Sequence, residues 1–447
     1  MKGMNKKNES LILSRLFVSL NESALGYSVL RNYEHLPESL GGSDLDIAVL
    51  PEESERVAEL VKETLKHYGG EIVVDYKSSG HFMRALGYHV GEWWGIAIDL
   101  FSKIEYKGVE YISSSDVIAR SKVYRDITVT RDEDAAAIAL IKELLANGKT
   151  RKDYFSDLAS QYSDNGPSAL HLLHASFDSS TVSELVRVLD SGDDSKTTLA
   201  TLAHQLRSDV LESNSIGKGE ARFNNVWSRV RRIFCPPGLC VVVTGTDGAG
   251  KTTVIDQIIP VLEAALHSRV QYEHMRPNWL SSLGVATGKR EAENEGVVAN
   301  PHAQRPSGFL ASLVRLGYYI LDYTLGYWCK IYPGLVKRPC VCIFDRYFYD
   351  VLIDPKRMRM ALPKWIMKLF FAFVPKPELL ICLGANPEVL YSRKPETSLE
   401  EVERQVGELK KLAQTTKNAV WVDTAQSVQS TVNQVLRAIQ ITMASRY

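Results

Sequence analysis

A glycine-rich stretch that follows an apolar run constrains this chain more than any other feature. Residues 241–253 read VVVTGTDGAGKTT and contain the spacing Gly245-x4-Gly250-Lys251-Thr252. A helical pattern follows, and this strand–loop–helix setting favours a phosphate-binding loop over a chance lysine in a glycine-rich turn. Glycines there let backbone N–H groups surround phosphate oxygens, and the helix N-terminus adds partial positive charge. We therefore predict that Lys251 contacts the terminal phosphates of a nucleoside triphosphate and that the Thr252 hydroxyl holds Mg²⁺.

The length of the chain limits the number of domains, and its charge balance limits the class of partner. The chain has 447 residues, so we expect two or three domains rather than one core. Lysine and arginine together number 53, as do aspartate and glutamate, and the formal net charge is +0. Because there is no basic excess, nucleic acid is not an expected partner.

Cysteine usage and hydropathy favour a cytoplasmic protein without a membrane span. The six cysteines include no C-x-x-C pair, and Cys340, Cys342 and Cys382 lie in apolar runs, as buried thiols do in a reducing cytosol. The first residues lead into no long apolar stretch, so we predict no secretory signal. The most membrane-like segment, residues 313–335, carries three charged residues, and we therefore predict a buried helix there.

Changes in pattern along the chain divide it into three regions. Residues 1–125 alternate helical and strand-like segments, residues 126–235 look helical and polar, and residues 236–447 alternate short apolar strands with longer helices. A Cys-Pro-Pro-Gly sequence at 235–238 marks the boundary before the glycine-rich loop. The fold class that we expect is α/β, with a parallel sheet and flanking helices in the C-terminal region, an α+β N-terminal region and a helical middle.

A second strand in the C-terminal region ends in an acidic residue. Residues 340–344 form a short buried-strand pattern that runs into Asp345 and Arg346. Beside a phosphate-binding loop, such an aspartate would lie near the metal at the carboxyl edge of the sheet; its alternative role is to cap a helix. Further on, a helical segment carries Arg393 and Lys394. Two adjacent cations can close over phosphates during phosphoryl transfer, although such a pair is also typical of a solvated helix face.

Together these segments resemble thymidylate kinases. The resemblance rests on motifs in the same order: GTDGAGKTT at 245–253, Asp345-Arg346-Tyr347, VPKPEL at 374–379, PEV at 387–389 with Arg393, and VDTA at 422–425. It covers residues 236–447. It implies a nucleoside-monophosphate-kinase fold, ATP with Mg²⁺ as the phosphoryl donor, and a small-molecule phosphoryl acceptor.

The resemblance also implies roles for individual residues. Arg346 would contact the acceptor's phosphate or the transferring group, Arg393 and Lys394 would belong to the lid, and Asp423 would lie in a turn near adenine. With the loop chemistry above, the residues that we expect to act in phosphoryl transfer are Lys251, Asp345, Arg346, Arg393 and Lys394. The residues that we expect around ATP and its Mg²⁺ are Gly245, Asp247, Gly248, Gly250, Lys251, Thr252, Thr253 and Asp423.

The acceptor side departs from that family. Thymidylate kinases carry an Arg-Glu-Pro-Gly-Gly-type segment after the second strand, where this chain reads HMRPNW at 274–279. A long polar insertion follows from Leu280 to Ser307, and the next helix is rich in tyrosines, most of which we expect in the core. We therefore expect a thymidylate-kinase-like kinase whose acceptor need not be dTMP.

The N-terminal region carries a second acidic pattern. Asp44 and Asp46 alternate along an expected strand, so their carboxylates share one face, and Asp99 lies on another expected strand. Three converging carboxylates can hold one or two Mg²⁺ ions beside a triphosphate. This arrangement resembles the minimal nucleotidyltransferase fold over residues 1–125, although a Gly-Gly-Ser turn at 41–43 abuts the first aspartate where that family leaves a longer spacer. The departure leaves catalysis open, and a β-turn before a half-exposed strand is the alternative.

Three functions fit these observations. The leading one joins a kinase to a nucleotidyltransferase-like domain, in the chemical order that activates a sugar or a similar metabolite for nucleotide-sugar or polysaccharide precursor metabolism. The second is a true dTMP kinase with an accessory domain. The third is an ATP-gated regulatory protein with a degenerate N-terminal module, which acceptor-dependent ATP turnover would separate from the first two. A homodimer is compatible with the sequence, which fixes neither the acceptor nor the oligomeric state.

Overall fold

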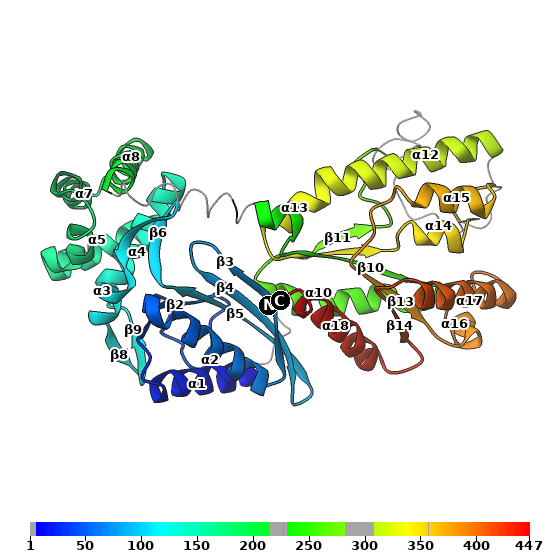
Figure 1. The fold of residues 1–447 in the computed structure, drawn as a ribbon, viewed down its shortest axis with the longest axis horizontal. Helices are drawn as coiled ribbons and strands as arrows, with labels where there is room; N and C mark the ends of the chain where they lie inside the picture. The colour runs from blue at the N-terminus through cyan, green and yellow to red at the C-terminus, as the bar shows by residue number, and fades with distance from the viewer. Residues whose placement is uncertain (1–5, 214–226, 228–229, 282–307, 356) are drawn as a thin grey trace. The chain divides into compact units, whose positions relative to one another are not determined.

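The chain divides into two compact units, Met4–Arg231 and Arg232–Tyr447, each built around its own main sheet (Figure 1). The computed structural model describes residues 6–213, 227, 230–281, 308–355 and 357–447. Residues 282–307, which make up most of the expected polar insertion, lie outside the described residues. Within the part that is described, no helix is both long and apolar enough to cross a membrane.

The C-terminal unit is built on a five-stranded parallel sheet with the order β11-β12-β10-β13-β14. Its strands are β10 (Leu239–Gly245), β11 (Gln271–His274), β12 (Val341–Asp345), β13 (Leu379–Gly384) and β14 (Ala419–Asp423). The three central strands are buried along their whole length, which accounts for their continuous apolar sequences. Because all five strands run parallel, their carboxyl ends meet at one edge, where such sheets bind ligands.

Helices cover both faces of this sheet (Figure 1). They are α10 (Lys251–Leu266), α12 (Phe309–Gly326), α13 (Tyr332–Lys337), α14 (Tyr349–Ile353), α15 (Lys364–Phe371), α16 (Pro387–Arg393), α17 (Leu399–Thr415) and α18 (Val428–Ala444), with a π-helical turn, η5 (Tyr327–Ile331), after α12. The predicted α/β fold class, with a parallel sheet and flanking helices, is confirmed.

The segment 313–335, predicted as a buried helix, is buried on one side only. It runs through α12, η5 and α13. Leu316 and Tyr323 pack into the core of the unit, whereas Val314 and Leu321 are exposed. The prediction was wrong on this point because apolar composition alone does not tell a core side chain from an exposed one.

The N-terminal unit holds a seven-stranded mixed sheet with the order β3-β4-β5-β2-β1-β9-β8. Its strands are β1 (Tyr27–Val29), β2 (Leu45–Val49), β3 (Gly70–Lys77), β4 (His81–His89), β5 (Glu92–Phe101), β8 (Lys122–Tyr124) and β9 (Ile127–Val129), and a separate pair is formed by β6 (Lys103–Tyr106) and β7 (Val109–Ser113). Strands β2 and β5 run parallel and pair Asp46 with Asp99. Two of the expected acidic residues therefore lie side by side.

Helices pack on both faces of this mixed sheet and define two apolar cores. The helices are α1 (Lys6–Glu22), η1 (Pro51–Glu53), α2 (Ser54–His67), α3 (Ser114–Ala119), α4 (Asp132–Asn147), α5 (Lys152–Asn165), η2 (Gly166–Leu170), α6 (His171–His174), α7 (Ser179–Ser191) and α8 (Lys196–Ser213). Ile47 and Ile98 join the core with α1 and α2, whereas Ala48 and Phe101 join the core with α4 to α8. The helical middle region thus shares a core with the N-terminal sheet, and strand alternation assigns Asp46 and Asp99 to that same face.

Candidate functional sites

The glycine-rich loop joins the carboxyl end of β10 to the N-terminus of α10. Gly248 and Gly250 have φ angles of +81° and +77°, in the region that favours glycine. At Gly245, a Cβ atom would lie 2.5 Å from the backbone oxygen of Leu383 on β13, so no larger residue fits. The loop therefore follows a path that depends on its glycines.

Lys251 is held inside this loop. Its Nζ donates hydrogen bonds to the carbonyl oxygens of Gly245 and Thr246, both at 2.9 Å, and the side chain is buried. Burial, together with the nearby Arg346 guanidinium, lowers the pKa of Lys251 to about 7. A phosphate group placed at the loop would add negative charge beside Nζ and would raise this pKa.

Asp345 lies at the carboxyl end of β12, next to β10, and not at the start of a helix. The Tyr272 hydroxyl donates a hydrogen bond to its Oδ2 at 3.3 Å, and Nδ1 of His274 lies 3.7 Å from the same oxygen. Burial alone would raise the pKa of Asp345, but His274, Lys251 and Arg346 lower it below its usual value. Its Oδ1 is buried and has no hydrogen-bond partner among the described residues. This edge of the sheet thus presents an anionic oxygen that suits a cation.

Arg346 is the centre of a buried ion-pair network. Its φ angle of +70° is uncommon for a residue other than glycine, so the surrounding structure must enforce it. Its guanidinium donates to Asp350 Oδ1 at 2.9 Å and to Asp247 Oδ1 at 2.6 Å, while Arg357 donates to Asp247 Oδ2 at 2.7 Å. Burial alone would raise the pKa of Asp247, but Arg346, Arg357 and Lys251 lower it to about 2. Two guanidinium groups therefore meet at one carboxylate of the loop.

Other residues expected to act on ATP border the loop. Thr252 and Thr253 occupy the first turn of α10 and are exposed. The Cβ atoms of Arg393 and Lys394 lie 3.5 Å and 3.4 Å from the position that a Cβ atom on Gly248 would take. The C-terminal end of α16 therefore contacts the loop, and the side chains of Arg393 and Lys394 begin next to Gly248.

A turn after β14 lies next to this end of α16. The Arg393 guanidinium donates a hydrogen bond to the backbone oxygen of Thr424 at 2.9 Å. Asp423 accepts a hydrogen bond from the backbone N–H two residues further on at 2.8 Å, which shapes the turn. The structure thus brings the expected lid cation Arg393 to the turn that contains Asp423.

The segment 274–279, at the carboxyl end of β11, is held by hydrogen bonds to Asp322 of α12. The Arg276 guanidinium donates to Asp322 Oδ2 at 2.9 Å. Asp322 is fully buried and also accepts hydrogen bonds from the backbone N–H groups of Trp279 and Leu280, at 2.9 Å and 2.7 Å. Arg276 therefore has an internal anionic partner.

In the N-terminal unit, two arginines hold the three expected carboxylates. Arg84, on β4, donates from Nη1 to Asp99 Oδ1 at 2.5 Å and from Nη2 to Asp44 Oδ2 at 3.3 Å. Arg31 donates from Nε to Asp46 Oδ2 at 2.5 Å. Two guanidinium groups therefore pair with the three carboxylates of this cluster, which we call the acidic cluster.

One of the two buried members of the acidic cluster, Asp99, has a strongly shifted pKa. Burial raises the pKa of Asp99 to about 6; Arg84 opposes the shift, and Asp44 and Asp46 add to it. Across the described ranges, no group of three or more histidine, cysteine, aspartate or glutamate side chains is arranged to hold a metal ion. The expected Mg²⁺ site at Asp44, Asp46 and Asp99 stays a prediction, and an ion there would have to displace Arg84 from two carboxylates.

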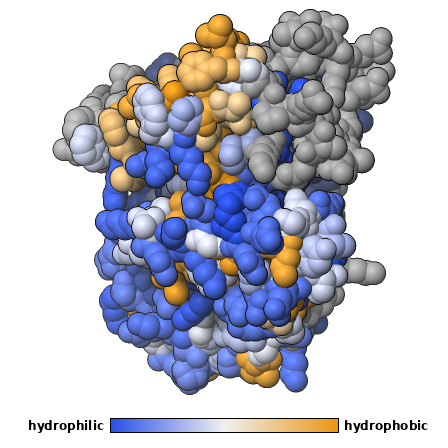
Figure 2. Space-filling view, turned by 90° about the vertical axis from the view of Figure 1, so that its right-hand side faces the viewer, coloured by the Kyte–Doolittle hydropathy of each residue, from blue (hydrophilic) through white to orange (hydrophobic). Residues whose placement is uncertain are grey.

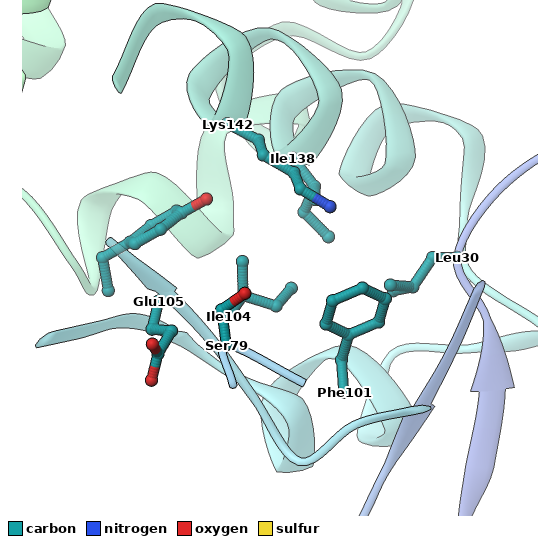
Figure 3. Close-up of a pocket in the computed structure, with 8 residues that line it drawn as sticks. Leu30, Ser79, Phe101, Ile104, Glu105, Ile138 and Lys142 are labelled. Carbon is teal, nitrogen blue, oxygen red and sulfur yellow. The ribbon is translucent and has the colours of Figure 1, made fainter. Parts of the chain in front are cut away.

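An apolar recess lies on the same face of the sheet as the acidic cluster. Phe101 follows Asp99 by two positions on β5 and so shares its face. The recess is small, with a cavity volume of about 30 Å³, which is enough for about one water molecule. In Figure 3, Ile138 and Lys142 of α4 face Phe101 and Leu30 across this space. One face of the sheet thus combines a charged cluster with an apolar surface.

Sequence reasoning missed the ion-pair partners that complete both clusters. They are Arg31, Arg84, Asp350 and Arg357. One signal was available, because Asp350 follows Arg346 by four positions, a spacing that brings side chains together in helical segments. Asp350 also accepts a hydrogen bond from the Thr244 hydroxyl on β10 at 3.0 Å, so it ties Arg346 to the central strand.

Comparisons with known proteins add a partial similarity. No protein-family model matches the chain. The chain is similar to the thymidylate kinases of Xanthomonas euvesicatoria pv. vesicatoria (strain 85-10), with 28% identity, and Xanthomonas oryzae pv. oryzae (strain PXO99A), with 29% identity, over 156 residues in each case. The match covers 34% of this chain and 58% of each relative, so the chain spans little more than half the length of those proteins. The similarity agrees in part with the resemblance found in the motifs and supports a nucleotide-kinase-like function.

Proposed function

We propose that the C-terminal unit transfers the terminal phosphoryl group of ATP·Mg²⁺ to a small-molecule acceptor, as nucleoside-monophosphate kinases do. The observation that carries this proposal is the meeting of Lys251, Asp345 and Arg346 beside a glycine-dependent loop at the carboxyl edge of the sheet. Chemistry of this kind needs positioning and charge stabilisation more than covalent steps. These three residues supply both.

Each residue of the loop region has a role in this proposal. The buried Oδ1 of Asp345 and the exposed Thr252 hydroxyl fit Mg²⁺, which would neutralise charge on the phosphates when bound. Lys251 would hold the terminal phosphates, and the contact of Arg393 and Lys394 with the loop supports a role for them in closing over ATP. The turn that holds Asp423 would then lie near adenine.

The acceptor is proposed to differ from dTMP. Arg276, at the position of the acceptor motif, is engaged by the buried Asp322, whereas Arg346 and Arg357 converge on Asp247. Sites built on specific hydrogen bonds reject analogues strongly. We therefore expect dTMP to be a poor substrate of the purified chain.

A screen of ATP consumption tests both statements. ADP release is measured with nucleoside monophosphates, free sugars and sugar phosphates, with Lys251→Ala as the blank. The proposal expects turnover that depends on one acceptor class and a weak response to dTMP. An efficiency with dTMP of roughly 10⁴ M⁻¹s⁻¹ or more, typical of enzymes, would favour a true dTMP kinase with an accessory domain. Tight ATP binding without acceptor-dependent turnover would favour an ATP-gated regulator.

A second activity is proposed for the N-terminal unit. The pairing of Asp46 with Asp99 on parallel strands, with Asp44 in the same cluster, supports a nucleotidyltransferase-like site that binds Mg²⁺ and a nucleotide. Kinase and nucleotidyltransferase steps in series would activate a sugar or a similar metabolite for polysaccharide precursors. Nucleotide binding that requires Mg²⁺ and is lost in Asp46→Asn tests this role.

A further inference from the structure

Two arginines meet beside the acidic cluster, and the helical middle region supplies one of them. Arg31, which follows β1, donates from Nε to Asp46 Oδ2 at 2.5 Å and from Nη1 to the Tyr154 hydroxyl of α5 at 3.4 Å. The guanidinium of Arg151 lies 5.7 Å from the centre of the Tyr154 ring. The two guanidinium groups therefore contact the same tyrosine, and one of them holds a carboxylate of the cluster.

A lysine of α4 reaches the same face of the sheet. Lys142 Nζ lies 4.7 Å from the centre of the Phe101 ring, and Phe101 follows Asp99 by two positions on β5. Figure 3 shows the Lys142 side chain extending from α4 toward Phe101. Lys142 is exposed, so its ammonium group is open to solvent. We call Arg31, Lys142 and Arg151 the cationic group.

Arg31 keeps donors for a further anion. A guanidinium carries five N–H groups. Among the described residues, that of Arg31 makes the two hydrogen bonds given above, which leaves N–H groups without an acceptor. The Arg31 side chain is 42% exposed, whereas that of Arg84 is 8% exposed. Arg31 can therefore hold Asp46 and contact a phosphate at the same time.

The other two members of the cationic group are not paired with carboxylates. Within the described ranges, neither Lys142 nor Arg151 forms an ion pair, and their recorded contacts are those with aromatic rings. Nearby acidic side chains have other partners. Glu105 is 2.9 Å from a lysine of its own strand β6, and Glu143 accepts a hydrogen bond at 3.0 Å from an asparagine of α4.

The segment before α5 adds positive charge at the same place. Residues 149–152 read KTRK, and Arg151 is the N-cap residue of this 14-residue helix. The N-terminus of a helix presents backbone N–H groups and partial positive charge, both of which favour phosphate. The acidic residue of the first turn, Asp153, is exposed and opposes this charge only in part.

Exposed cations alone would not identify a site, because solvated surfaces carry many of them. Figure 2 shows hydrophilic side chains over most of one side of the molecule, below the hydrophobic side chains at its top. The cationic group differs from such a surface in its placement. Its members come from three elements, and each contacts the acidic cluster or a residue adjacent to it.

We propose that Arg31, Lys142 and Arg151 bind the polyphosphate of a nucleoside triphosphate at the acidic cluster. The carboxylates there already have guanidinium partners, so a divalent ion beside them would leave positive charge in excess. A polyphosphate supplies the opposite charge, and arginine binds phosphate through several N–H groups at once. The inference rests on the nucleotide site proposed for the N-terminal unit, and it makes the helical middle region part of that site.

Calorimetric titration of the full chain with Mg²⁺ and inorganic tripolyphosphate tests the proposal. Every protein carries Lys251→Ala, so that the glycine-rich loop contributes little to binding. Arg151→Gln, which breaks no ion pair, and Arg31→Gln should each weaken binding about tenfold. Lys142→Gln should weaken it roughly threefold, and Arg151→Lys should restore part of the affinity because it keeps the charge. Arg187→Gln, at a side chain of α7 that is 68% exposed, is the matched control and should bind normally.

Asp46→Asn separates this inference from the function on which it rests. Tripolyphosphate binding that Asp46→Asn abolishes but that folded Arg31→Gln and Arg151→Gln proteins retain in full would overturn the cationic group and leave the nucleotide site standing. Binding that Arg151→Gln weakens and Asp46→Asn leaves unchanged would also overturn it, because the basic segment would then take polyanions apart from the acidic cluster. No binding by the Lys251→Ala chain would overturn both. Circular dichroism checks that each variant is folded.

Discussion

The charged clusters of the two units differ in how their carboxylates are paired. In the C-terminal unit, Lys251 donates to neutral carbonyl oxygens, and Asp345 keeps one buried oxygen without a hydrogen-bond partner among the described residues. In the N-terminal unit, Arg84 bridges Asp99 and Asp44 and Arg31 pairs with Asp46, so each carboxylate already has a guanidinium partner. Among the described residues, Asp345 thus has no guanidinium partner, whereas each carboxylate of the acidic cluster has one.

This difference sets what each cluster requires of a ligand. At the loop, ATP·Mg²⁺ would supply the phosphate charge beside Lys251 and the cation beside Asp345, whose ionisable contact is His274 at 3.7 Å. At the acidic cluster, a divalent ion has to compete with an arginine that is itself buried. We therefore expect a single substitution in the C-terminal cluster to lower activity strongly. In the acidic cluster, we expect bound Mg²⁺ to offset the loss of an arginine.

The largest effect in this comparison is expected at Asp345. Asp345→Asn should lower phosphoryl transfer by roughly 10³-fold, because it removes the anionic oxygen proposed to hold Mg²⁺. Acceptor-dependent ADP release, measured across Mg²⁺ concentrations, gives the result. Asp256→Asn, on the exposed side of α10, is the matched control. A near-normal rate for Asp345→Asn would remove this residue from the proposed site.

A smaller effect, on stability, is expected at Arg84. Arg84→Met should destabilise the N-terminal unit by about 3 kcal/mol, because the buried Asp99 loses its partner. Mg²⁺ should restore much of that loss, since a divalent ion can take the place of the guanidinium. Urea unfolding with and without Mg²⁺ measures both effects, with the exposed Arg56→Met as control. If Mg²⁺ leaves the stability of Arg84→Met unchanged, the proposal of a Mg²⁺ site at the acidic cluster is wrong.

The smallest effect is a pH dependence that arises from Asp99. Its pKa is raised to about 6, so the folded state binds a proton more tightly than the unfolded state. Asp99 thus contributes stability that is present at low pH and is lost as pH rises through about 6. Because a metal ion binds the ionised carboxylate, Mn²⁺ affinity at the acidic cluster should fall about tenfold per pH unit below that value. Calorimetric titration should find this slope in the wild-type chain; the same slope in Asp99→Asn would contradict the assignment.

The backbone around both clusters could be predicted because its signals are local. The apolar run 379–383 became β13, and the run before the glycine-rich loop became β10. Strand lengths, helix periodicity and glycine positions depend on residues close together in the chain. The strand-like run that contains Asp99 was equally local and became β5, whereas Asp44, expected on a strand, lies one residue before β2.

The ion pairs could not be predicted in the same way. Asp247 and Arg357 are 110 positions apart, and no short pattern links them. Arg84 meets Asp99 because β4 pairs with β5 in one particular register, which depends on how the whole sheet packs. The sequence therefore identified residues that carry charge, but not the partners that decide whether a charge is left for a ligand.

The central claim is that the C-terminal unit transfers a phosphoryl group from ATP through Lys251, independently of the acidic cluster. The most direct test follows the labelled γ-phosphate of ATP into the acceptor identified by the screen, with the wild-type chain, Lys251→Ala and Asp46→Asn side by side. The account predicts labelled product with the wild-type chain and Asp46→Asn, and a loss of roughly 10³-fold or more with Lys251→Ala. A folded Lys251→Ala protein that labels the acceptor at a near-normal rate, or a wild-type chain that binds ATP and labels no acceptor, would contradict it.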